Sequence, residues 1–152
     1  MKKLAPIIAV LLFATGMAAF TTGSAQAATG CSGTLIDTYP AYNGGTVWAN
    51  VYLYYDSSTG DNCAVTQSTS AGGYGVSKPM NVYLTRCNET TQSNTCTTSS
   101  VNQTVHDAGN YAYYAGPVSI NAAGHCILVS GEETYDGVTV SADSHPIASH
   151  CG

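Results

Sequence analysis

The chain has 152 residues, of which only 9% are charged, and its formal net charge is −5 at pH 7. This length suits one domain with a core of modest size. Nine acidic residues against four basic ones argue against a nucleic-acid ligand, whose phosphates require Lys and Arg, and against binding to an anionic membrane surface.

Residues 1–27 have the features of a secretory signal peptide. A basic start and an apolar stretch precede the small-x-small cleavage site Ala25-Gln26-Ala27. We therefore expect residues 28–152 to form a secreted, extracellular β-domain without membrane insertion, in a compartment where disulfides form. This part keeps two basic residues, Lys78 and Arg86, against all nine acids, so its formal net charge is −7.

The composition after residue 27 favours strands over helices. Val, Thr and Tyr are abundant, and the aromatic side chains are 11 Tyr and one Trp because both Phe residues lie in the leader. We predict an all-β fold, namely a single disulfide-stabilised antiparallel β-sandwich or a small barrel.

The first half of the domain alternates strand and turn patterns. The clearest strand is 46–56, where two sets of residues alternate along the segment and would point to opposite faces of a sheet. A turn cluster at 57–62 leads into 63–67, the second arm of a predicted hairpin. A glycine-rich loop is predicted at 68–77, and another strand at 79–86.

The second half begins with a polar segment and continues with short strands. Residues 88–102 are almost all Thr, Ser, Asn and Gln, which predicts a protruding loop. Turn residues such as Gly109-Asn110 and Gly116-Pro117 separate the strand patterns that follow. The predicted short strands are 111–114, 118–121, 126–130 and 137–140.

Six cysteines follow the leader, and their number does not determine a unique pairing. Cys87 and Cys96 flank the polar segment, so a local bridge would hold its shape. A bridge from Cys126 to Cys151 would fix the end of the chain, which otherwise frays. The chain has no Cys-x-x-Cys pair, and an oxidising compartment competes for thiolates, so we expect no metal and no cofactor. The preferred bridges are Cys31–Cys63, Cys87–Cys96 and Cys126–Cys151.

The histidines are the main candidates for catalysis. His106 and Asp107 could form part of a general-base dyad, but adjacent strand residues point to opposite faces, and a solvated turn is the favoured interpretation. His145 and His150 could chelate a metal, although packing of the tail is favoured. An enzyme would use His106 or His125, but no catalytic signature stands out, so we expect a non-enzymatic protein.

Five aromatic residues are candidates for a binding surface. Trp48, Tyr52 and Tyr54 share one face of a predicted strand, and Tyr111 and Tyr113 share a face of another. An exposed row of aromatic rings can stack on sugars or contact a protein partner. The alternative interpretation is that these rings replace the missing Phe in the core.

Two segments suggest a relative. The run at 54–66, Tyr-Tyr-Asp-Ser-Ser-Thr-Gly-Asp-Asn-Cys-Ala-Val-Thr, and the run at 109–118, Gly-Asn-Tyr-Ala-Tyr-Tyr-Ala-Gly-Pro-Val, resemble the spore-associated protein A family of small secreted actinobacterial proteins. The final Cys-Gly is also similar. The resemblance implies a small exported protein of one domain, and it carries over no catalytic residue. It also implies that four cysteines are shared and that Cys87 and Cys96 form an added pair.

These observations predict a secreted protein that acts by surface contact. We expect its partner to be another extracellular protein or the surface of a cell or spore, and it could be an adaptor subunit of an exported assembly. The alternative is a binding module or protease inhibitor that presents the Cys87–Cys96 loop, or its exposed tyrosines, to a glycan or a protein.

Overall fold

The computed structural model describes residues 30–152. The predicted signal peptide at 1–27 and the start of the predicted domain at residue 28 lie outside the described residues. Within 30–152, no helix is long and apolar enough to cross a membrane.

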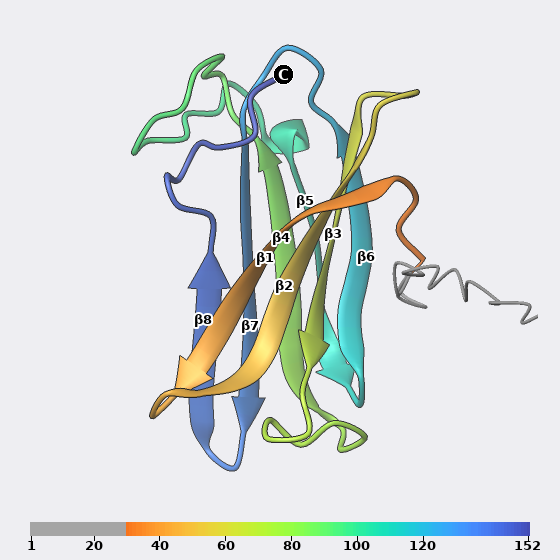
Figure 1. Ribbon diagram of the computed structural model, residues 1–152, viewed down its shortest axis with the longest axis vertical. Helices are drawn as coiled ribbons and strands as arrows, with labels where there is room; N and C mark the ends of the chain where they lie inside the picture. The colour runs from red at the N-terminus through yellow and green to blue at the C-terminus, as the bar shows by residue number, and fades with distance from the viewer. Residues whose placement is uncertain (1–29) are drawn as a thin grey trace, which may run out of the picture.

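Two antiparallel sheets of four strands each pack face to face (Figure 1). The first sheet has the strand order β1-β2-β3-β6, and the second has the order β5-β4-β7-β8. The predicted all-β sandwich is therefore confirmed, and the alternative of a small barrel is wrong because the strands form two separate sheets rather than a closed one. The strands are β1 (Thr34–Asn43), β2 (Thr46–Asp56), β3 (Asp61–Ser68), β4 (Lys78–Arg86), β5 (Thr104–Tyr111), β6 (Tyr114–Asn121), β7 (Ile127–Tyr135) and β8 (Val138–Asp143), with a short 3₁₀ helix at Val101–Gln103.

The main core lies between the inner faces of the two sheets. Alternate residues of each strand point inward, as strand geometry requires. Val51 and Leu53 of β2 meet Val82 and Leu84 of β4 and Val129 of β7, and all five are fully buried. Valine and leucine therefore fill this core in place of phenylalanine.

Tertiary pairing overrides the local sequence pattern in three regions. In one of them, Gly116 and Pro117, which were predicted to separate two strands, lie inside β6. β1 was not predicted, because its residues are largely polar or half exposed and show no clean alternation, but they pair along the edge of β2. Gly109 and Asn110 were predicted to be a turn, yet they lie in β5 opposite Met80 and Pro79. The turn instead falls at 112–113, inside the strand predicted at 111–114.

Three disulfides brace the sandwich, and they join the pairs that the sequence analysis preferred. Cys31–Cys63 ties the segment before β1 to β3 across 32 positions of sequence. Cys87–Cys96 closes the polar loop between β4 and β5, and Cys126–Cys151 ties the C-terminal tail to the start of β7. The last two bridges pack together in one small buried cluster at the upper end of the molecule.

Gly131 of β7 packs directly against β2 and β3 of the other sheet. A Cβ built there would lie 2.8 Å from Val51 Cγ2 and still closer to Thr66 Oγ1. We therefore expect Gly131→Ala to lower the free energy of unfolding by about 1–3 kcal/mol through overpacking. Urea denaturation measures this change, with Ser141→Ala on the exposed face of β8 as the control, and equal stability of the two variants would contradict the expectation.

Candidate functional site

The lower end of the sandwich in Figure 1 gathers exposed apolar side chains. Four connections meet there, those between β1 and β2, β3 and β4, β5 and β6, and β7 and β8. We call this surface the loop end. Its exposed large side chains, each 41–57% accessible to solvent, are Tyr42, Tyr74, Val76, Tyr113 and Val138.

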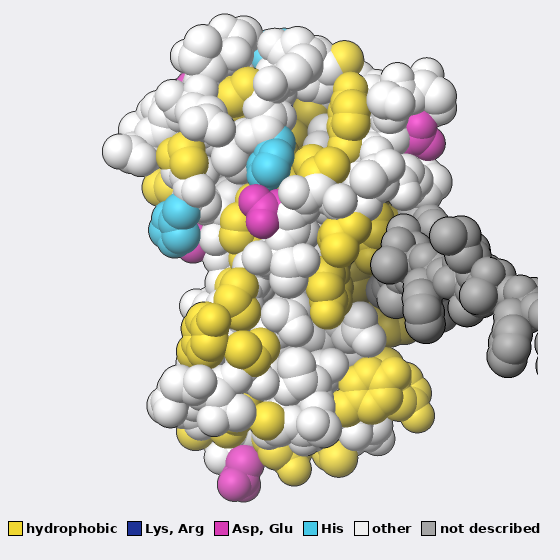
Figure 2. Space-filling view, viewed as in Figure 1, with side chains coloured by type: hydrophobic (Ala, Val, Ile, Leu, Met, Phe, Trp, Pro, Cys, Tyr) yellow, Lys and Arg dark blue, Asp and Glu magenta, His cyan; other side chains and the backbone are white. Residues whose placement is uncertain are grey.

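The loop end carries almost no charge. In its four connections, at 44–45, 69–77, 112–113 and 136–137, the one charged residue is Asp136. Figure 2 shows hydrophobic side chains spread over this lower region, whereas the histidines and most acidic side chains seen in this view lie higher. Loops rich in Tyr, Ser and Gly are typical of antibody binding sites, because tyrosine offers a large contact area at a low cost in conformational entropy.

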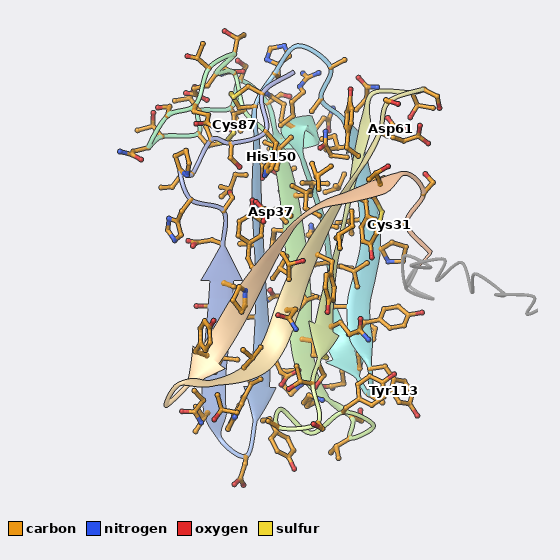
Figure 3. The ribbon with its side chains drawn as sticks, in the orientation of Figure 1. Cys31, Asp37, Asp61, Cys87, Tyr113 and His150 are labelled. Carbon is orange, nitrogen blue, oxygen red and sulfur yellow. A yellow bond between two sulfur atoms is a disulfide. The ribbon has the colours of Figure 1, made fainter. Side chains whose placement is uncertain are left out.

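Two of the exposed tyrosines form a pair across neighbouring connections. The ring centroids of Tyr74 and Tyr113 lie 4.9 Å apart with an interplanar angle of 59°, and Figure 3 shows Tyr113 at the lower right, beside the end of the sandwich where β5 and β6 meet. The backbone N–H of Gly75 donates to the carbonyl of Ala112 at 2.7 Å. The N–H of Ser68 donates to the carbonyl of Tyr113 at 3.0 Å. These contacts hold the β3–β4 loop against the β5–β6 turn.

A buried lysine contacts the β3–β4 loop from the inner side. Lys78 Nζ donates to the carbonyl oxygens of Gly73 at 2.9 Å and Val76 at 3.2 Å. Gly73 has a positive φ of 80°, and a Cβ at this position would lie 2.6 Å from Cζ of the Tyr135 ring and still closer to its Cε2, so the sequence needs glycine here. The loop is therefore fixed on its inner side as well as at its tip.

Lys78 also pairs with the buried acid Glu133. Their charged atoms lie 3.9 Å apart, and the side chains are 4% and 0% exposed. Neither carboxylate oxygen of Glu133 has a hydrogen-bond partner within residues 30–152. Burial raises the pKa of Glu133, and the Ser68 side chain and the charge of Lys78 oppose this shift only in part. Burial lowers the pKa of Lys78, and the charge of Glu133 opposes that shift only in part.

The three aromatic residues predicted on β2 serve mainly in packing. Tyr54 is buried beside the Cys31–Cys63 bridge, and Tyr52 packs half-buried against the same cluster. Trp48 is half-buried, and its ring meets that of Tyr135 edge to face at 5.9 Å. The structure therefore brings no exposed aromatic row together on this strand.

The other two predicted aromatic residues have different surroundings. Tyr111 is half-buried against the core, and its hydroxyl donates to Asp107. Tyr113 is 50% exposed and belongs to the loop end. Sequence reasoning missed Tyr42 and Tyr74, although the position of Tyr74 among three glycines was a usable signal of an exposed ring.

The predicted pair of His106 and Asp107 does not form a dyad. His106 stacks on Tyr83 on the outer face of its sheet, with ring centroids 5.2 Å apart and planes within 10°. Asp107 accepts hydrogen bonds from the Gly116 N–H at 2.7 Å and from the Tyr111 hydroxyl. The hydrogen bond from Tyr111 is the main reason why the pKa of Asp107 is lowered.

The two histidines near the end of the chain have separate partners. His145 Nε2 lies 2.7 Å from an oxygen of Asp143. His150 Nε2 lies 3.1 Å from Asp37 and 3.0 Å from the hydroxyl of Tyr39, which joins the tail to β1 (Figure 3). Because each histidine contacts a different carboxylate, they do not converge on a shared position.

The Cys87–Cys96 loop protrudes at the upper end but is tightly held. The N–H of Thr97 donates to the Glu89 carboxylate at 2.9 Å, and Ser93 pairs with Ala148 of the tail. The sulfurs of the bridge lie within 4.8 Å of a Glu89 oxygen, but they are bonded to each other and offer no thiolate to a metal.

Comparison with known proteins finds a distant similarity to one protein. The chain is similar to spore-associated protein A of Streptomyces coelicolor. The identity is 29% over 148 residues, covering 94% of this chain and 79% of the relative. No family model and no solved structure matches the chain. The spore association in the name of this distant relative and the three disulfides are compatible with an extracellular location.

Proposed function

We propose that this chain is an exported, non-catalytic protein that acts by contact at the surface of a cell or spore, and that the loop end is its contact surface. The observation that carries this proposal is an almost uncharged, tyrosine-rich end on a chain with 9 acidic residues. The distant similarity to spore-associated protein A supports the setting. His106, His145 and His150 contact different partners and do not converge on a shared position, which is consistent with the proposed non-catalytic role.

The rigidity of the loop end supports a role in binding. Hydrogen bonds fix the β3–β4 loop on both sides, and Tyr74 packs on Tyr113 before any partner arrives. A preorganised surface loses less conformational freedom on binding. Tyrosine is also among the residues that most often dominate binding energy at protein interfaces. The partner proposed here is another extracellular protein, either exposed on the cell or spore surface or part of an exported assembly.

A binding measurement with matched variants tests this proposal. We expect the labelled protein to bind washed cells or spores saturably. The double variant Tyr74→Ala/Tyr113→Ala should weaken that binding at least tenfold, because truncating a dominant interface tyrosine costs about 2 kcal/mol or more. Val101→Ala is the matched control, because Val101 is 89% exposed but lies at the opposite end. The same weakening in both variants, or no saturable binding by the wild type, would overturn the proposal.

A further inference from the structure

The outer face of the second sheet is polar and hollowed. The strand registers place His106, Tyr83, Ser130 and Asp143 in one row across β5, β4, β7 and β8, and Ala108, Asn81, Glu132 and Ser141 in the next. Between these rows lies a hollow of about 390 Å³, walled by Tyr83, Glu132 and Asp143 and lined by small serines. This face is separate from the loop end.

A second hollow of about 400 Å³ continues along the same face. Its lining includes Pro79, Asn110 and Thr134, and it shares Asn81 and Glu132 with the first hollow. The side-chain amide of Asn81 donates to Glu132 at 3.0 Å, so this pair forms a low ridge between the two. Because β4 rises roughly 3.3 Å per residue, the path from residue 79 to residue 83 is about 13 Å long. An elongated ligand could therefore cross both hollows.

Tyr83 offers a fixed aromatic wall to the first hollow. One face of its ring is stacked on His106, which comes from β5, whereas the hollow lies on the side of β7 and β8. The opposite face of the ring therefore borders the hollow, and the side chain is 38% exposed. A ring held in this way can receive the apolar face of another ring without first losing its own rotational freedom.

The polar groups around the hollows suit a ligand rich in hydroxyl groups. The carboxylates of Glu132 and Asp143 accept hydrogen bonds, and the serine hydroxyls both donate and accept them. Neither lining contains a lysine or arginine. A phosphate or a uronic acid would therefore meet the carboxylates of Glu132 and Asp143 without a lysine or arginine to offset them, and the neighbouring imidazole of His145 already contacts Asp143.

We propose that these hollows bind a neutral, extended oligosaccharide, with one sugar ring stacked on Tyr83 and with its hydroxyls donating to Glu132 and Asp143. The ridge formed by Asn81 and Glu132 contacts the link between neighbouring sugar rings. This site does not depend on the proposed role of the loop end, since the two surfaces share no residue.

NMR titration of the isotope-labelled domain tests the proposal, with cellotetraose and tetra-N-acetylchitotetraose as neutral probes and tetragalacturonate as the acidic control. We expect a neutral probe to shift the amide signals of Ser130, Gly131 and Ser141 saturably, and the acidic probe to leave them unchanged. Tyr83→Ala should weaken binding roughly tenfold, and Tyr83→Phe should retain it. Tyr113→Ala at the loop end should bind the sugar like the wild type.

Several results would overturn the site. The proposal fails if neither neutral probe shifts any amide signal at millimolar concentration, or if the shifts are confined to another surface. It also fails if tetragalacturonate binds equally well, or if Tyr83→Ala binds the neutral probe as tightly as the wild type. Glu132→Gln provides a second variant in case Tyr83→Ala disturbs the fold, and full affinity in Glu132→Gln would also contradict the assignment. If the wild-type protein binds cells or spores but binds neither neutral sugar, this inference is wrong and the proposed function is unaffected.

Discussion

Replacing Lys78 with Met is expected to lower the free energy of unfolding by about 3–5 kcal/mol, which is typical of removing one partner from a buried ion pair. Lys78 and Glu133 are almost fully buried, and Glu133 has no hydrogen-bond partner in the described chain. The variant leaves this carboxylate without a counter-charge. It also removes the donor to the carbonyls of Gly73 and Val76 that fix the β3–β4 loop.

The dependence of this loss on pH separates the charge effect from simple loss of packing. Burial raises the pKa of Glu133 above its ordinary value of 4.5, so the native state holds the proton more tightly than the unfolded state. The stability contributed by the neutral acid is therefore complete below pH 4.5 and is lost as the pH rises through the native pKa. In Lys78→Met the lysine no longer favours the ionised form, so the deficit should be smaller at pH 4, where mainly the lost hydrogen bonds to Gly73 and Val76 contribute, and should grow toward pH 7.

Urea denaturation at several pH values measures both effects. The double variant Lys78→Met/Glu133→Gln removes both charges and should recover part of the stability lost in the single variant. A deficit in Lys78→Met that is the same at pH 4 and pH 7, with no recovery in the double variant, would show that the pair acts by packing alone.

Replacing Cys31 and Cys63 together with Ala is expected to lower the free energy of unfolding by about 4 kcal/mol, because this bridge spans the longest stretch of sequence of the three. The bridge spans 32 positions and restricts the unfolded chain most strongly. It also packs against Tyr54 and Val65 on the outer side of the first sheet, so its loss opens this cluster to water.

The Cys87–Cys96 bridge is the matched control. It spans only 9 positions, for which chain entropy gives about 2.6 kcal/mol. Thermal and urea unfolding of the two double-alanine variants compares them directly, and amide spectra check that each retains the fold. If loss of the short bridge destabilised the protein more than loss of the long one, local packing rather than chain entropy would govern these bridges.

Parts of the fold with local signals were predictable from the sequence. The alternation along β2 and the turn at 57–60 needed no knowledge of distant residues. The bridges were also accessible, because Cys87 and Cys96 flank a segment too polar to pack by itself. β1 was not accessible, because its strand conformation depends on pairing with β2 rather than on its own residues.

The two candidate surfaces were harder to foresee, because each depends on residues that only the folded chain brings together. Tyr74 and Tyr113 are 39 positions apart in the sequence, and the contact between their connections makes them neighbours. Glu132 and Glu133 are adjacent in the sequence, yet strand geometry directs Glu132 to the surface hollow and Glu133 into the interior. The burial of Lys78 could not be predicted from the sequence, because it depends on how the β3–β4 loop folds over this side chain.

The tail that ends in Gly152 is fastened at the top of the sandwich, where Ser93 pairs with Ala148 and Cys126 with Cys151 (Figure 1). β4 has nine residues and spans roughly 30 Å from this end to the other. Anchoring the protein to a sensor chip or bead through its final residue would therefore point Tyr74 and Tyr113 away from the support. The two ends of the molecule therefore differ, because a disulfide secures the tail at one end and the other end carries free aromatic side chains.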